Sequence, residues 1–187
     1  GLLGSTKAST DQQHTGDTSD DIENVQAFMQ ASTRSTMQQV TPWIQSGHAI
    51  GSLCSKSDAS AHVTTVADLL VQWHHLDRHV HSALVCQAPA CRASLDQGRN
   101  LLRVAIPWLQ TDSSSKQALE LLNAVQVHIV ETNSVTSGHV APLFGILGHA
   151  LGLNVEQACH LMGFCVARDI VSAALRLNLL GPLAGVG

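Results

Sequence analysis

Apolar residues recur at helical spacing along most of the chain, and no stretch alternates with the period of two that is typical of a half-buried strand. The clearest stripe runs from Val66 to Leu84, with apolar residues at i, i+3, i+4 and i+7 and with Asp68, His75 and His79 on the other face. This stretch therefore predicts an amphipathic helix. Together, the apolar residues at helical spacing along the chain predict an all-α, single-domain helical bundle.

Capping residues and prolines indicate where the helices of the first half begin and end. Asp20 and Glu23 suit a capping box that starts a helix running to about Val40. The polar segment 47–61 then predicts a connection. A helix that follows Pro89 is expected to end at Pro107, because proline removes a helical hydrogen bond.

Similar signals place three helices in the second half. Ser113 to Ser115 supply an N-cap for a helix that reaches Ile129, and Pro142 opens a short helix that ends where Gly152 takes the left-handed cap. Asn154 caps the last helix, which is apolar on more than one side. We expect this last helix at the centre of the bundle or in a dimer seam.

The beginning of the chain differs from the rest. Residues 1–19 are polar and lack apolar periodicity, so they predict a flexible segment before a helical domain at residues 20–187. They also lack the basic and apolar regions of a signal peptide. The uncharged stretch 133–155 is broken by glycines and Pro142, which favours a soluble protein over a membrane span.

Composition narrows the possible partners and the compartment. The 187 residues carry a net charge of -4 with scattered basic residues, and aromatic residues make up 3%, which argues against nucleic acid and anionic membranes. Five cysteines without a C-x-x-C pair indicate a reducing compartment. We therefore expect a cytoplasmic protein.

The histidines of the stretch His74–His81 offer one candidate for chemistry. His75 and His79 stand at the i, i+4 spacing that can place two imidazoles on one metal ion. A solvated helix face explains the same pattern, because no third ligand is apparent. We therefore assign no metal ligand, and keep a metal-dependent hydrolase or a direct nickel-binding protein as alternatives.

The cysteines give weaker signals. The thiol of Cys91 stands next to Arg92, which suits either an activated thiol or an ordinary interhelix link. Cys159 and Cys165 are six positions apart on the last helix and face opposite ways, so they predict buried small hydrophobic residues. The chain contains no phosphate-binding glycine motif and no nucleophile elbow.

Several motifs carry a resemblance to a known family. The runs Ala141–Gly145, Leu151–Leu153, Arg168–Ala174 and Arg176–Leu183 resemble the C-terminal half of the UreF family of urease accessory proteins, in its plant and green-algal form. Upstream, residues 76–78 and the run from Arg92 to Ala105 that includes Gly98 resemble the family's central helix pair. The stretch from Ala27 to Trp43 resembles an earlier helix of the family more faintly.

The resemblance implies an all-helical homodimer without catalytic activity. It further implies a role as scaffold or chaperone that, with UreH (UreD) and the GTPase UreG, promotes nickel insertion into the urease apoprotein; nickel is then the delivered ion rather than a firmly bound cofactor. The residues that match the family motifs are expected to serve structure or interfaces: Arg92, Ser94, Gly98, Pro142, Gly145, Arg168, Asp169, Ser172, Arg176 and Gly181.

The sequence also departs from the family pattern. The glycine-rich N-terminal motif and the C-terminal tail are missing, so we expect a fragment. The motif histidine usually stands two residues before the proline, a place held here by Val140, with His139 one position further away. No role is therefore carried over to His139.

Overall fold

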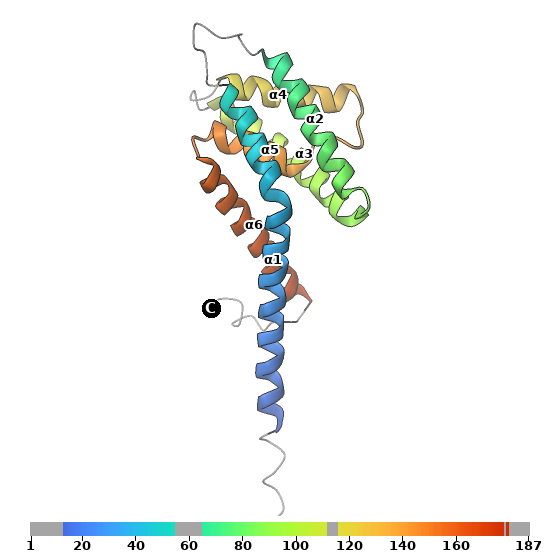
Figure 1. Cartoon of the computed structure of the whole chain (residues 1–187), viewed down its shortest axis with the longest axis vertical. Coiled ribbons are helices and arrows are strands. Elements are labelled where there is room, and N and C mark those ends of the chain that lie inside the picture. The colour runs from blue at the N-terminus through green and yellow to red at the C-terminus, as the bar shows by residue number, and fades with distance from the viewer. Residues whose placement is uncertain (1–12, 55–64, 112–115, 178, 180–187) are drawn as a thin grey trace, which may run out of the picture. The chain divides into compact units, whose positions relative to one another are not determined.

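The computed structural model describes residues 13–54, 65–111, 116–177 and 179, which form helices and no strand (Figure 1). This confirms the predicted all-α fold. The helices are α1 (Gln13–Leu53), α2 (Val66–Leu84), α3 (Ala88–Thr111), α4 (Lys116–Glu131), α5 (Val140–Ala150) and α6 (Val155–Arg176).

The chain divides into two compact units. One unit comprises residues 1–37 and 163–187, and the other comprises residues 38–162. The expected division between residues 19 and 20 stays a prediction, because residues 1–12 lie outside the described part of the chain.

Helix α1 is longer at both ends than the sequence predicted. It begins at Gln13 instead of at an Asp20 cap, and it continues through Pro42 to Leu53 instead of ending near Val40. Trp43 and Ile44, directly after the proline, are buried, and so is Ile50 two turns on. Burial of these side chains outweighs the helical hydrogen bond that the proline removes. The predicted connection 47–61 is therefore wrong for residues 47–53, which are helical, and residues 55–61 lie outside the described part of the chain.

Helix α3 likewise passes through a proline that was expected to end it. Pro107 is exposed, whereas Ile106 and Leu109 are buried in the core and keep the chain helical to Thr111. Pro89 stands in the first turn, where a missing N–H costs little. The predicted caps of α4 lie in the segment 112–115, outside the described residues.

Helix α5 lies among the helices of the second unit (Figure 1) and contributes buried side chains to its core. Eight residues of this short helix are buried, and it packs against α2, α3 and α4. Large buried side chains around it include Trp73, Leu121 and Leu143. The sequence placed the last helix at the centre or in a dimer seam. The first alternative is wrong, because the buried residues of α6 are limited to Ala158, Met162 and Ala174 in its described part.

Two glycines allow α1 and α5 to cross with their backbones in contact. A side-chain carbon at Gly145 would collide with the carbonyl oxygen of Ile44, and one at Gly47 would collide with that of Pro142. Glycine is needed where backbones approach this closely. The two motif residues Pro142 and Gly145 are thus buried structural positions.

The predicted caps at the end of α5 and at the start of α6 are confirmed, whereas α5 begins at Val140 rather than at Pro142. Gly152 adopts a left-handed conformation with φ +73° after α5, and Leu153 donates its N–H to the Gly148 carbonyl. Asn154 and Gln157 then form a capping box in which each side chain accepts the other's backbone N–H.

The first unit carries an apolar groove of about 840 Å³, whose lining includes Phe28, Met29, Ile170, Ala173, Leu177 and Leu179. Phe28 is 67% exposed and Leu177 is 69% exposed.

By length and composition alone, α6 could cross a membrane. One such helix is a weak indication, because a core helix of a soluble protein passes the same test. The absence of a membrane partner therefore stays a prediction.

Candidate functional site

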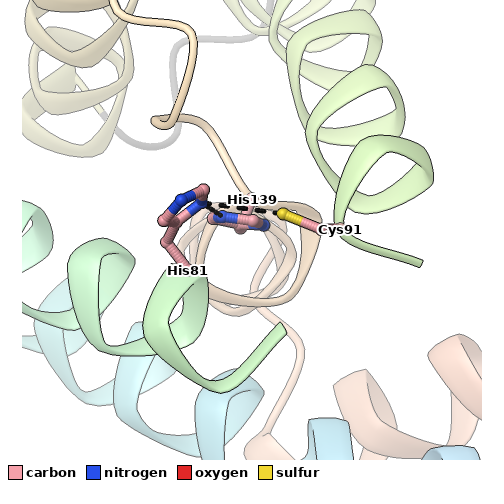
Figure 2. A group of neighbouring side chains, drawn as sticks. All are labelled: His81, Cys91 and His139. Atoms are coloured by element: carbon pink, nitrogen blue, oxygen red, sulfur yellow. Dashed lines mark hydrogen bonds between the residues drawn. The ribbon is translucent and has the colours of Figure 1, made fainter. Parts of the chain in front are cut away.

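Three side chains with metal-binding atoms meet in the second unit: His81, Cys91 and His139 (Figure 2). One ligand atom from each lies within 4.8 Å of the others. The Nδ1 atom of His81 is 3.2 Å from Nε2 of His139 and 3.6 Å from Sγ of Cys91. Cys91 and His139 are buried and His81 is half-buried.

A short link between α2 and α3 brings His81 and Cys91 together. His81 lies in the last turn of α2, where its carbonyl accepts the N–H of Val85 at 2.9 Å. Cys91 lies in the first turn of α3, and its N–H donates to the Gln87 carbonyl at 2.9 Å. Because only residues 85–87 separate the helices, the two side chains face one another across the turn.

His139, the third member of the cluster, lies at the end of the loop between α4 and α5. Asn133, with φ 44°, ends α4 in a left-handed cap in which Ser134 donates its N–H to the Ile129 carbonyl at 3.2 Å. Gly138, with φ 103°, then turns the chain toward α5, whose N-cap residue is His139. A side chain would be strained at Gly138.

Asp77 fixes the position of this loop. Its side chain is fully buried, and its carboxylate oxygens accept the N–H groups of Gly138 at 2.9 Å and of His139 at 2.8 Å. Burial raises the pKa of Asp77 to about 6, while the two hydrogen bonds and the nearby Arg99 act in the opposite direction. The carboxylate is therefore ionised at neutral pH, and its oxygens are occupied by backbone donors.

Arg99 holds the same loop from α3. Its guanidinium donates to the carbonyl oxygen of Ser134 at 2.6 Å and to that of Ser137 at 3.2 and 3.3 Å. One helical residue earlier, Gly98 lies directly against the loop, because a side-chain carbon there would collide with the Gly138 carbonyl. The loop that carries His139 is thus held from two helices.

The imidazole of His139 is oriented from both of its nitrogens. Nδ1 lies 3.1 Å from the hydroxyl of Ser94, and Nε2 faces His81. Burial, together with the charges of His81 and Arg99, lowers the pKa of His139 to about 4. The ring is therefore neutral at pH 7 and keeps one nitrogen lone pair. Two imidazoles and a thiol form a donor set that suits borderline-soft metal ions.

The structure separates the histidines that the sequence grouped. Only His81 of the stretch His74–His81 faces this cluster. The ring of His74 packs against that of His128 with centroids 5.3 Å apart, whereas His75 and His79 are exposed. In the described residues, no third potential ligand joins His75 and His79. Cys91 likewise faces His81, while its neighbour Arg92 is exposed.

The motif residues from the family resemblance do not gather at one place. Ser94 and Gly98 support the cluster, while Pro142 and Gly145 lie buried in α5. On α6, Arg168 and Asp169 form an exposed ion pair of 2.8 Å, and Arg176 donates to the Ser172 carbonyl at 3.2 Å. Gly181 lies outside the described residues. Their interfacial role stays a prediction.

Sequence reasoning missed Asp77, Arg99 and His139 as members of one arrangement. Asp77 carried a readable signal, because it lies on the apolar stripe of α2 between Trp73 and Val80. A carboxylate on a buried face requires hydrogen-bond donors. The donors are the N–H groups of Gly138 and His139, which lie 61 and 62 positions after Asp77. No local pattern in the sequence indicates this pairing.

Comparisons with known proteins place the chain in a family. The UreF family model matches residues 20–187. Urease accessory protein F of Oryza sativa subsp. japonica is 36% identical over 112 residues, which is 60% of this chain and 40% of the relative. Urease accessory protein F of Arabidopsis thaliana is 32% identical over 111 residues, which is 59% of this chain and 42% of the relative.

A fungal relative matches a shorter stretch. Urease accessory protein 6 of Cryptococcus neoformans var. grubii is 49% identical over 47 residues, which is 25% of this chain and 15% of the relative. No solved structure matches. The matches thus span less than half of each of these relatives. Because the family model covers residues 20–187, with all the residues of the cluster and most of the described helices, the chain belongs to the UreF family.

Proposed function

We propose that this chain is a urease accessory protein that acts as a scaffold and not as an enzyme. The observation that carries the proposal is the match of the UreF family model to residues 20–187, joined by relatives that bear the name urease accessory protein. In this role the chain, together with UreH (UreD) and the GTPase UreG, promotes nickel insertion into the urease apoprotein in the cytoplasm.

Exposed apolar surface supports a protein that works by binding other proteins. The groove of the first unit presents Phe28 and Leu177 to solvent, and Phe164 is 65% exposed. Exposed apolar patches of this kind are typical of interaction surfaces. We propose this surface for homodimer formation or for binding the accessory partners.

The alternative of a metal-dependent hydrolase has less support. Many hydrolytic metal sites use a carboxylate as the general base that takes a proton from the attacking water. The carboxylate of Asp77, which holds the backbone of His139, is fully buried and accepts the N–H groups of Gly138 and His139. Direct nickel binding is the stronger of the two alternatives.

Co-purification tests the proposed scaffold role. A tagged form of this chain, expressed together with the UreH and UreG homologues, should recover both partners. Circular dichroism and size-exclusion chromatography of the same preparation serve as the control for correct folding. Recovery of neither partner by a chain that remains helical and monodisperse would contradict the proposal.

A further inference from the structure

The cluster of His81, Cys91 and His139 has the spacing of a metal site. In a tetrahedral site with metal–nitrogen bonds of about 2.0–2.1 Å and metal–sulfur bonds of about 2.3 Å, two nitrogens lie about 3.3 Å apart and a nitrogen and a sulfur about 3.6 Å apart. The corresponding distances are 3.2 Å between the two histidine nitrogens and 3.6 Å between His81 Nδ1 and Cys91 Sγ. One ion placed between these atoms satisfies both.

The side chains around the cluster hold it in place before any metal arrives. The Ser94 hydroxyl lies 3.1 Å from Nδ1 of His139, which leaves Nε2 directed at His81 (Figure 2). Asp77 fixes the backbone of His139 through its N–H at 2.8 Å. In metal sites, the ring nitrogen of a histidine that does not bind the metal usually makes a hydrogen bond to another group, and Ser94 is placed to do this for His139.

The donor set decides which ions fit. Two imidazoles and one thiolate suit Ni²⁺, Zn²⁺ and copper ions, whereas Mg²⁺ and Ca²⁺ prefer oxygen ligands. The cluster offers three protein ligands and includes the half-buried His81, so one coordination position remains for water or for a ligand from a partner. An open position suits an ion that is passed on rather than one that holds the fold together.

We propose that His81, Cys91 and His139 bind one divalent transition-metal ion, and that Ni²⁺ in transit to urease is the ion they serve. The identity of the ion as cargo rests on the proposed function, whereas the binding itself rests on the three side chains. Binding releases the thiol proton of Cys91 to solvent, because the thiolate is the form that ligates a metal.

Titration calorimetry with NiCl₂ alone, on the purified metal-free chain, tests the site. We expect one Ni²⁺ per chain with a Kd of about 1 μM or below. The heat should depend on the ionisation enthalpy of the buffer because a proton is released. Binding should also produce a thiolate-to-nickel charge-transfer band in the near ultraviolet. ZnCl₂ should compete for the same site, and MgCl₂ should not.

Matched substitutions assign the ligands. Cys91→Ser and His81→Gln should each weaken nickel binding by at least about tenfold, and Cys91→Ser should abolish the charge-transfer band. Cys86→Ser and His79→Gln change an exposed cysteine and an exposed histidine near the same turn, and they should bind nickel like the wild type. Circular dichroism confirms that each variant is folded.

Two results overturn the site: no nickel binding by the folded wild type, or nickel binding that survives both Cys91→Ser and His81→Gln. The outcome is separate from that of the co-purification experiment. A chain that recovers UreH and UreG but binds no nickel contradicts only the metal site. A chain that binds nickel through Cys91 but recovers neither partner contradicts only the scaffold role.

Discussion

The carboxylate of Asp77 accepts the backbone N–H of His139 at 2.8 Å, although the two residues are 62 positions apart. This bond, together with the matching bond to Gly138 at 2.9 Å, joins α2 to the loop that leads into α5. Asp77 and His139 are both fully buried. The Asp77 carboxylate therefore positions the His139 imidazole through the backbone of His139 rather than through a hydrogen bond to the ring.

The substitution Asp77→Asn should destabilise the chain by about 1–3 kcal/mol, because the amide keeps one acceptor but places an NH₂ group against a buried backbone N–H. Urea unfolding followed by circular dichroism measures the change. Asp96→Asn alters an exposed carboxylate on α3 and should leave the unfolding midpoint in place. Equal stability of Asp77→Asn and the wild type would show that the loop is not held by Asp77.

His139 should make the stability of the metal-free chain depend on pH. Its pKa is about 4 in the folded chain and 6.5 when unperturbed, so between these values the unfolded chain binds the extra proton. This contribution to stability is complete above about pH 6.5 and is lost as the pH falls toward 4. The free energy of unfolding should therefore fall less steeply with decreasing pH in His139→Asn than in the wild type.

Asp77 should act with the opposite sign. Its pKa is raised from 3.8 to about 6 in the folded chain, so the folded state binds the extra proton between these values and gains stability as the pH falls. Removing His139 should thus expose this second dependence in urea titrations between about pH 4 and pH 7. Parallel pH profiles for the wild type and His139→Asn would contradict the assignment to His139, and a His139→Asn chain that gains no stability as the pH falls from 7 to 4 would contradict the assignment to Asp77.

Gly98→Ala should destabilise the chain by about 3 kcal/mol or more, because the added carbon meets the backbone of Gly138 and His139 rather than a movable side chain. Gly163→Ala is the matched control on another helix, since the added carbon there meets only the Met37 side chain at 3.8 Å or beyond. That control should be neutral, or stabilising by up to about 1 kcal/mol through helix propensity. Thermal unfolding of both variants compares them, and a stable Gly98→Ala would rule out the close approach.

Reversing the charges of the exposed pair, as Arg168→Glu with Asp169→Arg, tests the predicted interfacial role of the α6 motif. An exposed pair contributes little to stability, so the double variant should unfold at the same temperature as the wild type. If the motif is an interface, recovery of UreH or UreG in a co-purification should nevertheless fall. Unchanged recovery of both partners would mean that this pair is an ordinary surface ion pair.

Local signals predicted the helices well where they were strong. The stripe from Val66 to Leu84 and the caps at Gly152 and Asn154 appear in the structure as predicted. The helix ends predicted near Val40 and at Pro107 were wrong. Burial of Trp43 beside Pro42 and of Ile106 beside Pro107 outweighs the helical hydrogen bond that each proline removes. Tertiary packing of this kind has no local signature.

The candidate site was only partly readable for a related reason. The sequence drew attention to His81 through its neighbours and to Cys91 through Arg92, but the geometry pairs His81 with Cys91 and His139 instead. His139 stands one position away from the usual family histidine, and Gly138 and Asp77 determine where its ring lies. The residue spacing alone does not reveal this backbone geometry.

Urease activation in cells tests the central claim most directly. A strain that lacks its UreF but contains urease apoprotein, UreH and UreG is supplied with this chain and with nickel, and urease activity is measured in lysates. Our account predicts that activity rises clearly above that of the strain with an empty vector. The account is contradicted if the chain accumulates as folded protein and urease stays inactive, while a complete UreF from a relative restores activity in the same strain.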